Sequence, residues 1–126
     1  MAARDEVLRA GELEIRLGEG LVRAAGGVLT LSVREFQLLV AMARRAGGIL
    51  RRDELYRAVW GSELRPGDRS VDVYVSKLRS KLDAAMPDQR YIHTHPGFGY
   101  RFQPQPSRNL DNRAGASVQT ASGERR

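Results

Sequence analysis

Cationic and hydroxyl side chains share one side of the segment 69–82. Between Val71 and Leu82, apolar residues recur at offsets of 0, 4, 7 and 11, and on a helix these four positions fall within about 60° of arc. The opposite side presents Val73, Ser76, Lys77 and Ser80. Ammonium and hydroxyl groups bind phosphate oxygens and the edges of bases. The chemistry predicted for this segment is therefore recognition of a polyanion.

Other reactive groups are scarce. The chain has no cysteine, which excludes disulfides, thiolate metal sites and cysteine nucleophiles. His93 and His95 would share one face of a strand, but no carboxylate accompanies them as a further metal ligand. Gly97 and Gly99 are too close together for a dinucleotide-binding fingerprint. No Ser-His-Asp or paired-carboxylate spacing stands out, so we expect no enzyme activity, no metal and no cofactor.

Composition agrees with a polyanionic partner. The chain has 126 residues, which suits one domain, and its 21 Lys and Arg exceed its 15 Asp and Glu to give a net charge of +6. The excess lies beyond residue 31, because residues 1–31 hold four Arg against five acidic residues. Nucleic acid is the favoured partner. No apolar run approaches the length of a membrane span and no signal peptide opens the chain, so we expect a cytoplasmic protein.

Strands are predicted for the N-terminal third. Residues 13–17 alternate apolar and charged side chains, which is typical of a half-buried strand. Residues 21–24 and 28–31 are further candidates, joined by a two-residue turn at Gly26-Gly27, and residues 7–9 add an edge strand. The pattern predicts a four-stranded antiparallel sheet.

Three helices and a hairpin should follow. Ser32 and Glu35 form a capping box, which begins a helix with apolar residues at helical spacing, namely Phe36, Leu39, Val40 and Ala43. We expect Phe36, Leu38 and Leu39 to lie in the core. A second helix is expected over 52–60, a loop over 62–68, the third helix over about 69–82, and a hairpin over 91–102. The fold class is α+β, with a flexible segment 1–6, one domain over 7–103 and a disordered basic tail over 104–126.

Four motifs carry a resemblance to a known family. They are LSVREFQLL (31–39), RRDELYRAVWG (51–61), RSVDVYVSKLRSKL (69–82) and YIHTHPGFGYRF (91–102). In this order and spacing they resemble the DNA-binding domain of OmpR/PhoB-type response regulators. The resemblance implies a winged helix-turn-helix that binds specific double-stranded DNA for a bacterial transcription regulator. Its third helix would enter the major groove, and its hairpin would form a wing on the backbone or minor groove.

The resemblance also implies residue roles. Ser76 and Lys77 would read bases, and Val73 would touch a thymine methyl. The positions implied to contact the DNA backbone are Arg69, Tyr74, Arg79, Trp60, Thr94 and Tyr100. Additional DNA contacts are expected from Arg51, Arg52, Lys81 and His95. The loop 62–68 would contact RNA polymerase, and two copies, monomeric or weakly dimeric without DNA, would bind direct repeats head to tail.

Two residues depart from the family pattern. Pro96 stands where the wing usually carries a basic residue, so this position cannot place a guanidinium in the minor groove. Arg51 stands where Ser often caps the second helix, and loss of such a cap costs about 1 kcal/mol. The receiver domain that usually precedes this module is not part of the 126 residues.

Two other functions remain open at this stage. A winged helix that binds a protein should carry an apolar or acidic outer face on its third helix. An RNA-binding domain should display aromatic residues on its sheet, and residues 1–31 contain none.

Overall fold

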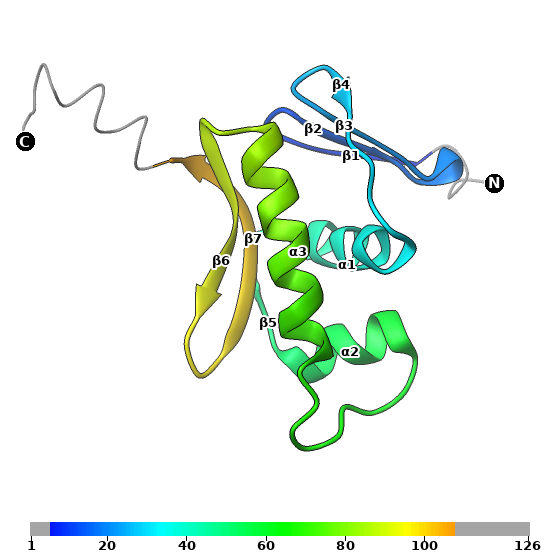
Figure 1. Ribbon diagram of the computed structural model, residues 1–126, viewed down its shortest axis with the longest axis vertical. Helices are drawn as coiled ribbons and strands as arrows, with labels where there is room; N and C mark the ends of the chain where they lie inside the picture. Colours follow the sequence, from blue (N-terminus) through cyan, green and yellow to red (C-terminus); the bar gives the residue numbers. More distant parts are fainter. Residues whose placement is uncertain (1–5, 108–126) are drawn as a thin grey trace, which may run out of the picture.

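Two antiparallel sheets enclose three helices in the computed structural model, which describes residues 6–107 (Figure 1). The N-terminal sheet has the order β1-β2-β3-β4. Its strands are β1 (Val7–Ala10), β2 (Leu13–Arg16), β3 (Leu21–Ala24) and β4 (Gly27–Val28). The predicted four-stranded sheet is therefore confirmed, and alternation along β2 and β3 buries Leu13, Ile15 and Val22.

Details of this sheet differ from the prediction. Leu17 belongs to the short 3-10 helix η2 (Leu17–Glu19) instead of to β2. The hairpin turn consists of Ala25 and Gly26, both with positive φ, because Ala24 pairs with Gly27. Strand β4 ends at Val28 and does not reach residue 31. A two-residue turn with two positive φ angles suits the right-handed twist of a hairpin.

Helix α1 (Val33–Arg44) begins with the predicted capping box. The Glu35 backbone N–H donates to Ser32 Oγ at 3.2 Å, and the Ser32 N–H donates to Glu35 Oε1 at 2.8 Å. Leu38 and Leu39 are fully buried, as predicted, and Met42, which was not predicted, is buried with them.

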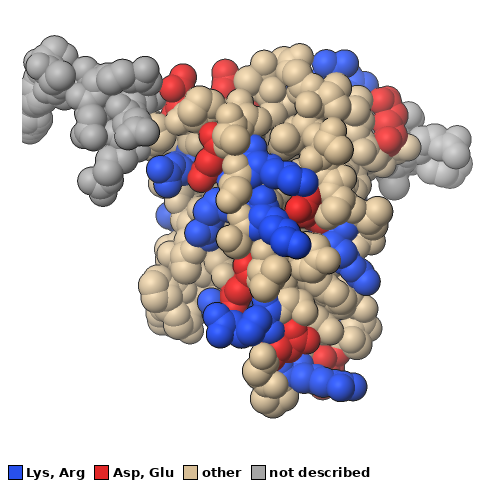
Figure 2. Space-filling model, viewed as in Figure 1, with Lys and Arg blue, Asp and Glu red and all other residues tan. Residues whose placement is uncertain are grey.

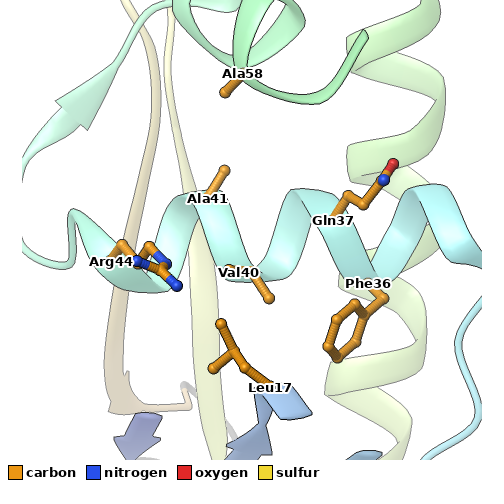
Figure 3. Close-up of a pocket in the computed structure, with 7 residues that line it drawn as sticks. All are labelled: Leu17, Phe36, Gln37, Val40, Ala41, Arg44 and Ala58. Carbon is orange, nitrogen blue, oxygen red and sulfur yellow. The ribbon is translucent and has the colours of Figure 1, made fainter. Parts of the chain in front are cut away.

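Phe36 and Val40 of α1 are only half-buried. They lie toward Leu17 and line an apolar groove of about 360 Å³ between η2, α1 and α2 (Figure 3). The remaining lining residues are Gln37, Ala41, Arg44 and Ala58. The apolar stripe of α1 is thus shared between the core and this groove.

Helix α2 (Arg52–Trp60) has its predicted bounds, while α3 (Ser70–Ala85) continues three residues past its predicted end. The aliphatic seam of α3, which consists of Val71, Val75, Leu78 and Leu82, belongs to the hydrophobic core. Helix α3 itself packs against α1, α2 and the C-terminal hairpin (Figure 1). None of the helices within residues 6–107 has the length and hydrophobicity that crossing a bilayer requires.

The second sheet has the order β5-β7-β6. Strands β6 (Gln89–His95) and β7 (Gly99–Pro106) form the predicted hairpin, which is longer than expected. Strand β7 continues to Pro106, three residues past the predicted domain end at 103, and the domain bounds themselves stay a prediction. Residues 1–5 and 108–126, which include most of the predicted flexible ends, lie outside the described residues. Strand β5 (Ile49–Leu50) was not predicted; it follows α1 after the turn over 45–48 and pairs with β7.

Close approach of β5 and β7 requires a glycine at position 99. A Cβ built on Gly99 would lie 2.0 Å from the Leu50 carbonyl oxygen, and its φ of 148° disfavours other residues. Gly97 in the hairpin turn also has a positive φ of 82°, but a Cβ there would meet open space. Position 99 therefore requires glycine for steric reasons, whereas position 97 favours glycine only because of its backbone conformation.

We expect Gly99→Ala to lower the free energy of unfolding by about 1–3 kcal/mol more than Gly97→Ala does, because only at position 99 must the backbone of β5 move away. Gly97→Ala is the control, with a loss of about 1–2 kcal/mol from backbone strain alone. Urea unfolding of both variants checks this. Equal losses would show that the contact with Leu50 adds nothing.

Candidate nucleic-acid interface

The outward face of α3 is open to solvent. Val71, Val75, Leu78 and Leu82 are buried, as predicted from their spacing. Ser76, Lys77 and Ser80 are exposed, and Val73 retains 47% of its surface. Lys and Arg side chains gather on the side of the molecule where α3 faces the viewer, with acidic side chains between them (Figure 2). The three residues predicted to read bases therefore share one accessible surface.

A shallow concavity lies along the first two turns of α3. Its lining brings Val73, Ser76 and Lys77 together with Arg69 and Asp72. Arg69 immediately precedes the helix, and its side chain is largely exposed. A predicted backbone contact thus adjoins all three predicted base contacts.

An aromatic row continues this surface toward α2. Tyr56 stacks on Trp60, with ring centroids 4.9 Å apart. The rings of Trp60 and Tyr74 pack edge to face, with centroids 5.7 Å apart. Lys77 Nζ lies 5.1 Å from the Tyr74 ring centroid and the Arg34 guanidinium 5.2 Å from that of Trp60. Cations over aromatic rings gain about 0.5–1 kcal/mol at exposed sites. Trp60 and Tyr74, two of the predicted backbone contacts, therefore lie against each other, with Lys77 over the Tyr74 ring, and their contact with DNA stays a prediction.

Arg34 was missed by the sequence reasoning. Its Nη1 donates to the Val59 carbonyl at 2.9 Å, which ties the start of α1 to the end of α2. Arg34 lies between Ser32 and Glu35 of the capping box, but no local pattern links residues 34 and 59.

Arg79 connects α3 to the hairpin. Its Nη2 donates to Thr94 Oγ1 at 2.7 Å, and its guanidinium lies 5.8 Å from the Tyr100 ring centroid. Arg79 Nε is buried without a hydrogen-bond partner among the described residues. Arg79 and Thr94, both predicted backbone contacts, are thus brought together across two elements.

Tyr100 lies beneath this surface, with only 5% of its surface exposed. Its hydroxyl donates to Asp72 Oδ1, and the Arg52 guanidinium lies 5.2 Å from its ring centroid. Burial, together with the hydrogen bond to Asp72, raises the pKa of Tyr100, so the hydroxyl remains a donor at neutral pH. Tyr100 therefore contacts Asp72 and Arg52 from a buried position. Its direct contact with a DNA backbone stays a prediction.

Asp72 forms ion pairs with Arg52 of α2 and with Arg69, which precedes α3. Arg52 Nε donates to its Oδ1 at 2.7 Å, and Arg69 Nε lies 3.4 Å from its Oδ2. Burial alone would raise the pKa of Asp72, but hydrogen bonds from Tyr100 and Arg52 and the charges of both arginines lower it below its usual value. The carboxylate is therefore ionised at neutral pH.

The four additional contacts predicted from the sequence occupy different settings. Arg52 belongs to the Asp72 cluster. Arg51 forms an ion pair with Asp53 at 3.1 Å, and its own backbone N–H donates to Glu54 Oε1 at 2.8 Å. Glu54 thus satisfies one of the amide groups at the start of α2. His95 is half-buried, and its Nε2 has no partner among the described residues.

Lys81 forms an ion pair with a buried carboxylate. Its Nζ donates to Glu35 Oε1 at 2.7 Å, and the Glu35 side chain is almost completely covered. Burial would raise the pKa of Glu35, but hydrogen bonds from Lys81 and Ser32 outweigh burial and lower it. Lys81 therefore neutralises a buried carboxylate in α1, while its own side chain keeps 41% of its surface exposed, and its contact with DNA stays a prediction.

Comparison with known proteins decides the family. Residues 26–102 match the family described as "Transcriptional regulatory protein, C terminal". The chain belongs to the OmpR/PhoB family of winged-helix DNA-binding domains. This is a family of transcription-regulator domains from two-component response regulators and not of enzymes, and it confirms the resemblance seen in the four motifs.

Curated relatives are longer than this winged-helix domain. The sensory transduction protein RegX3 of Mycobacterium tuberculosis is 32% identical over 99 residues, which cover 79% of this chain and 44% of RegX3. The transcriptional activator protein IrlR of Burkholderia pseudomallei is 36% identical, with 79% and 43% covered. The chain thus spans less than half the length of these relatives.

Solved structures have the same fold. The RstA DNA-binding domain of Klebsiella pneumoniae, in complex with the RstA box, is 34% identical with a TM-score of 0.72, and the match covers 79% of this chain and 99% of that domain. The CpxR DNA-binding domain from E. coli is 30% identical with a TM-score of 0.71, and 78% and 96% are covered. The winged helix-turn-helix fold is therefore established for this chain.

We expect Lys81→Met to lower the free energy of unfolding at pH 7 by about 1–3 kcal/mol, because Glu35 loses its partner. The pKa of Glu35 is lowered in the folded state. The stability from this pair is therefore present above the unfolded-state pKa and is lost as the pH falls through the folded-state pKa.

Urea unfolding from pH 7 towards pH 3 measures this difference between variant and wild type. It should shrink as Glu35 becomes protonated. A difference that stays constant over this range would contradict the role of the Glu35 charge.

Proposed function

We propose that this winged-helix domain binds specific sequences of double-stranded DNA for a bacterial transcription regulator. Helix α3 enters the major groove, with Ser76 and Lys77 at base edges and Val73 against a thymine methyl. The observation that carries the proposal is the outward face of α3, which is polar, cationic and exposed while its aliphatic seam is sealed in the core.

Backbone contacts surround this face. Arg69 and Tyr74 flank the base-reading residues, Trp60 adjoins Tyr74, and Arg79 with Thr94 lies on the side of the wing. Arg52 lies beside these backbone contacts through its ion pair with Asp72. Tyr100 is retained as a backbone contact from the resemblance. These residues fix the register of the domain on DNA and carry no sequence information themselves.

The wing, formed by the β6–β7 hairpin over 91–102, meets DNA without a guanidinium at its tip. Its turn and the first turn of α3 lie at the same end of the molecule (Figure 1). The turn residues are Pro96, Gly97 and Phe98, and Phe98 is 70% exposed. His95 and Thr94 are then the wing residues that face the backbone, and the minor groove is approached only by uncharged side chains.

The proposed partners come from the resemblance to the family. The exposed loop 62–68 between α2 and α3 contacts RNA polymerase, and two copies of the domain occupy direct repeats head to tail. The domain is monomeric or weakly dimeric without DNA, needs no cofactor or metal, and acts in the cytoplasm. The RstA domain in complex with its RstA box, at 34% identity, is the strongest support for DNA as the ligand.

A protein-interaction role receives less support. It would require an apolar or acidic outer face on α3, and there Val73 stands alone among Ser76, Lys77 and Ser80. The apolar groove beside Phe36 is built by α1, α2 and η2 and takes no residue from α3 (Figure 3). Binding of DNA through α3 leaves that groove unused.

We expect Lys77→Ala to cost about 1–3 kcal/mol on a specific duplex and to relax sequence preference, because a base contact is lost. The specific duplex is one selected by the wild-type chain from a randomised library, and the comparison duplex is a shuffled version. Arg9→Ala, an exposed change on β1, is the matched control. Equal losses of affinity on both duplexes would remove Lys77 from the base-reading residues.

We expect Arg79→Ala to weaken binding to all sequences about equally, because a phosphate contact is lost. The slope of log affinity against log salt concentration should become shallower by about one unit. Titrations at several salt concentrations measure it, with Arg23→Ala on β3 as the matched control. An unchanged slope would remove Arg79 from the phosphate contacts.

A further inference from the structure

An acidic residue occupies the surface that is proposed to face DNA. Asp72 lines the concavity of α3 beside Val73, Ser76 and Lys77, and its side chain is 22% exposed. A carboxylate facing a polyanion is repelled by every phosphate nearby, whatever the base sequence. Its presence on this face therefore lowers affinity for DNA in general.

The same carboxylate holds two cations of that surface. Arg52 from α2 and Arg69 from the start of α3 both lie within ion-pair distance of Asp72, at 2.7 Å and 3.4 Å. The Tyr100 hydroxyl from β7 donates to the same oxygen as Arg52. Asp72 is thus held by the hydroxyl of the buried Tyr100, and it restrains Arg52 closely and the more exposed Arg69 less closely.

Fixed arginines discriminate better than free ones. A long cationic side chain without a partner can reach whichever phosphate lies nearest, and this gain is equal for all sequences. Arginines held in one place match phosphates only when the base contacts set the register of the helix. Repulsive or restraining elements of this kind raise specificity at the expense of affinity.

We propose that Asp72 is a specificity-determining residue, which positions Arg52 and Arg69 for the specific site and lowers affinity for other DNA. This role rests on the proposed function, because it presupposes that α3 faces DNA. Asp72 acts through the two arginines and needs no contact with a base. Its effect is therefore expected on the ratio of specific to non-specific binding.

The test is Asp72→Asn, which keeps the shape and the acceptor for Tyr100 but removes the charge. Affinity for the shuffled duplex should rise by on the order of threefold to tenfold, with a salt slope steeper by about one unit. The ratio of affinities for the selected and shuffled duplexes should fall about tenfold. A change that merely damages the fold would weaken both duplexes instead.

Two further variants separate charge from position. Glu63→Gln removes an equal charge from the exposed loop 62–68, where no ion pair involves it among the described residues. It should leave the ratio unchanged. Asp72→Glu keeps the charge and displaces the carboxylate by one methylene, so affinity for the shuffled duplex should stay constant while the ratio falls. Thermal unfolding confirms that each variant is folded, and Asp72→Glu carries the test if Asp72→Asn is not.

Three results would overturn the role of Asp72. They are an unchanged ratio in Asp72→Asn, an unchanged ratio in Asp72→Glu, or the same changes in Glu63→Gln as in Asp72→Asn. Failure of the proposed function is distinguishable, because the wild-type chain would then bind the selected and shuffled duplexes equally.

Discussion

Burial of one aliphatic seam determines how this domain presents its chemistry. Val71, Val75, Leu78 and Leu82 are sealed between α1, α2 and the C-terminal hairpin. Each buried side chain of this size gains about 1.5–3 kcal/mol, so rotation of α3 about its axis would be costly. Because the seam is fixed, the opposite side of the helix must face solvent, and that side holds the cationic and hydroxyl groups.

The surface around α3 is assembled from separate elements by side chains of opposite character. Aromatic rings from α2 and α3 carry cations above them, and Asp72 joins α2 and α3 to Tyr100 of β7. Arg79 completes the connection to β6 through Thr94. The residues that we propose to face DNA are therefore mutually restrained, which is the condition for reading a rigid duplex with few contacts.

Local chemistry made much of the fold predictable. The capping box at Ser32, the bounds of α2 and the seam of α3 depend on neighbours within a turn or two of helix. Strand β5 has only two residues, and its pairing with β7 depends on Gly99, about fifty residues away. The burial of Tyr100 and the engagement of Lys81 by Glu35 also depend on distant partners, which is why sequence patterns placed the first three features and missed the others.

The single tryptophan of the chain is Trp60, half-buried between Tyr56 and Tyr74 at the edge of the surface described above. Indole emission depends on the polarity around the ring and on neighbouring quenchers. Because no second tryptophan adds background, the intrinsic fluorescence of the whole chain reports on this one location. The domain thus contains its own optical probe, at a site that a duplex bound as we propose would shield from water.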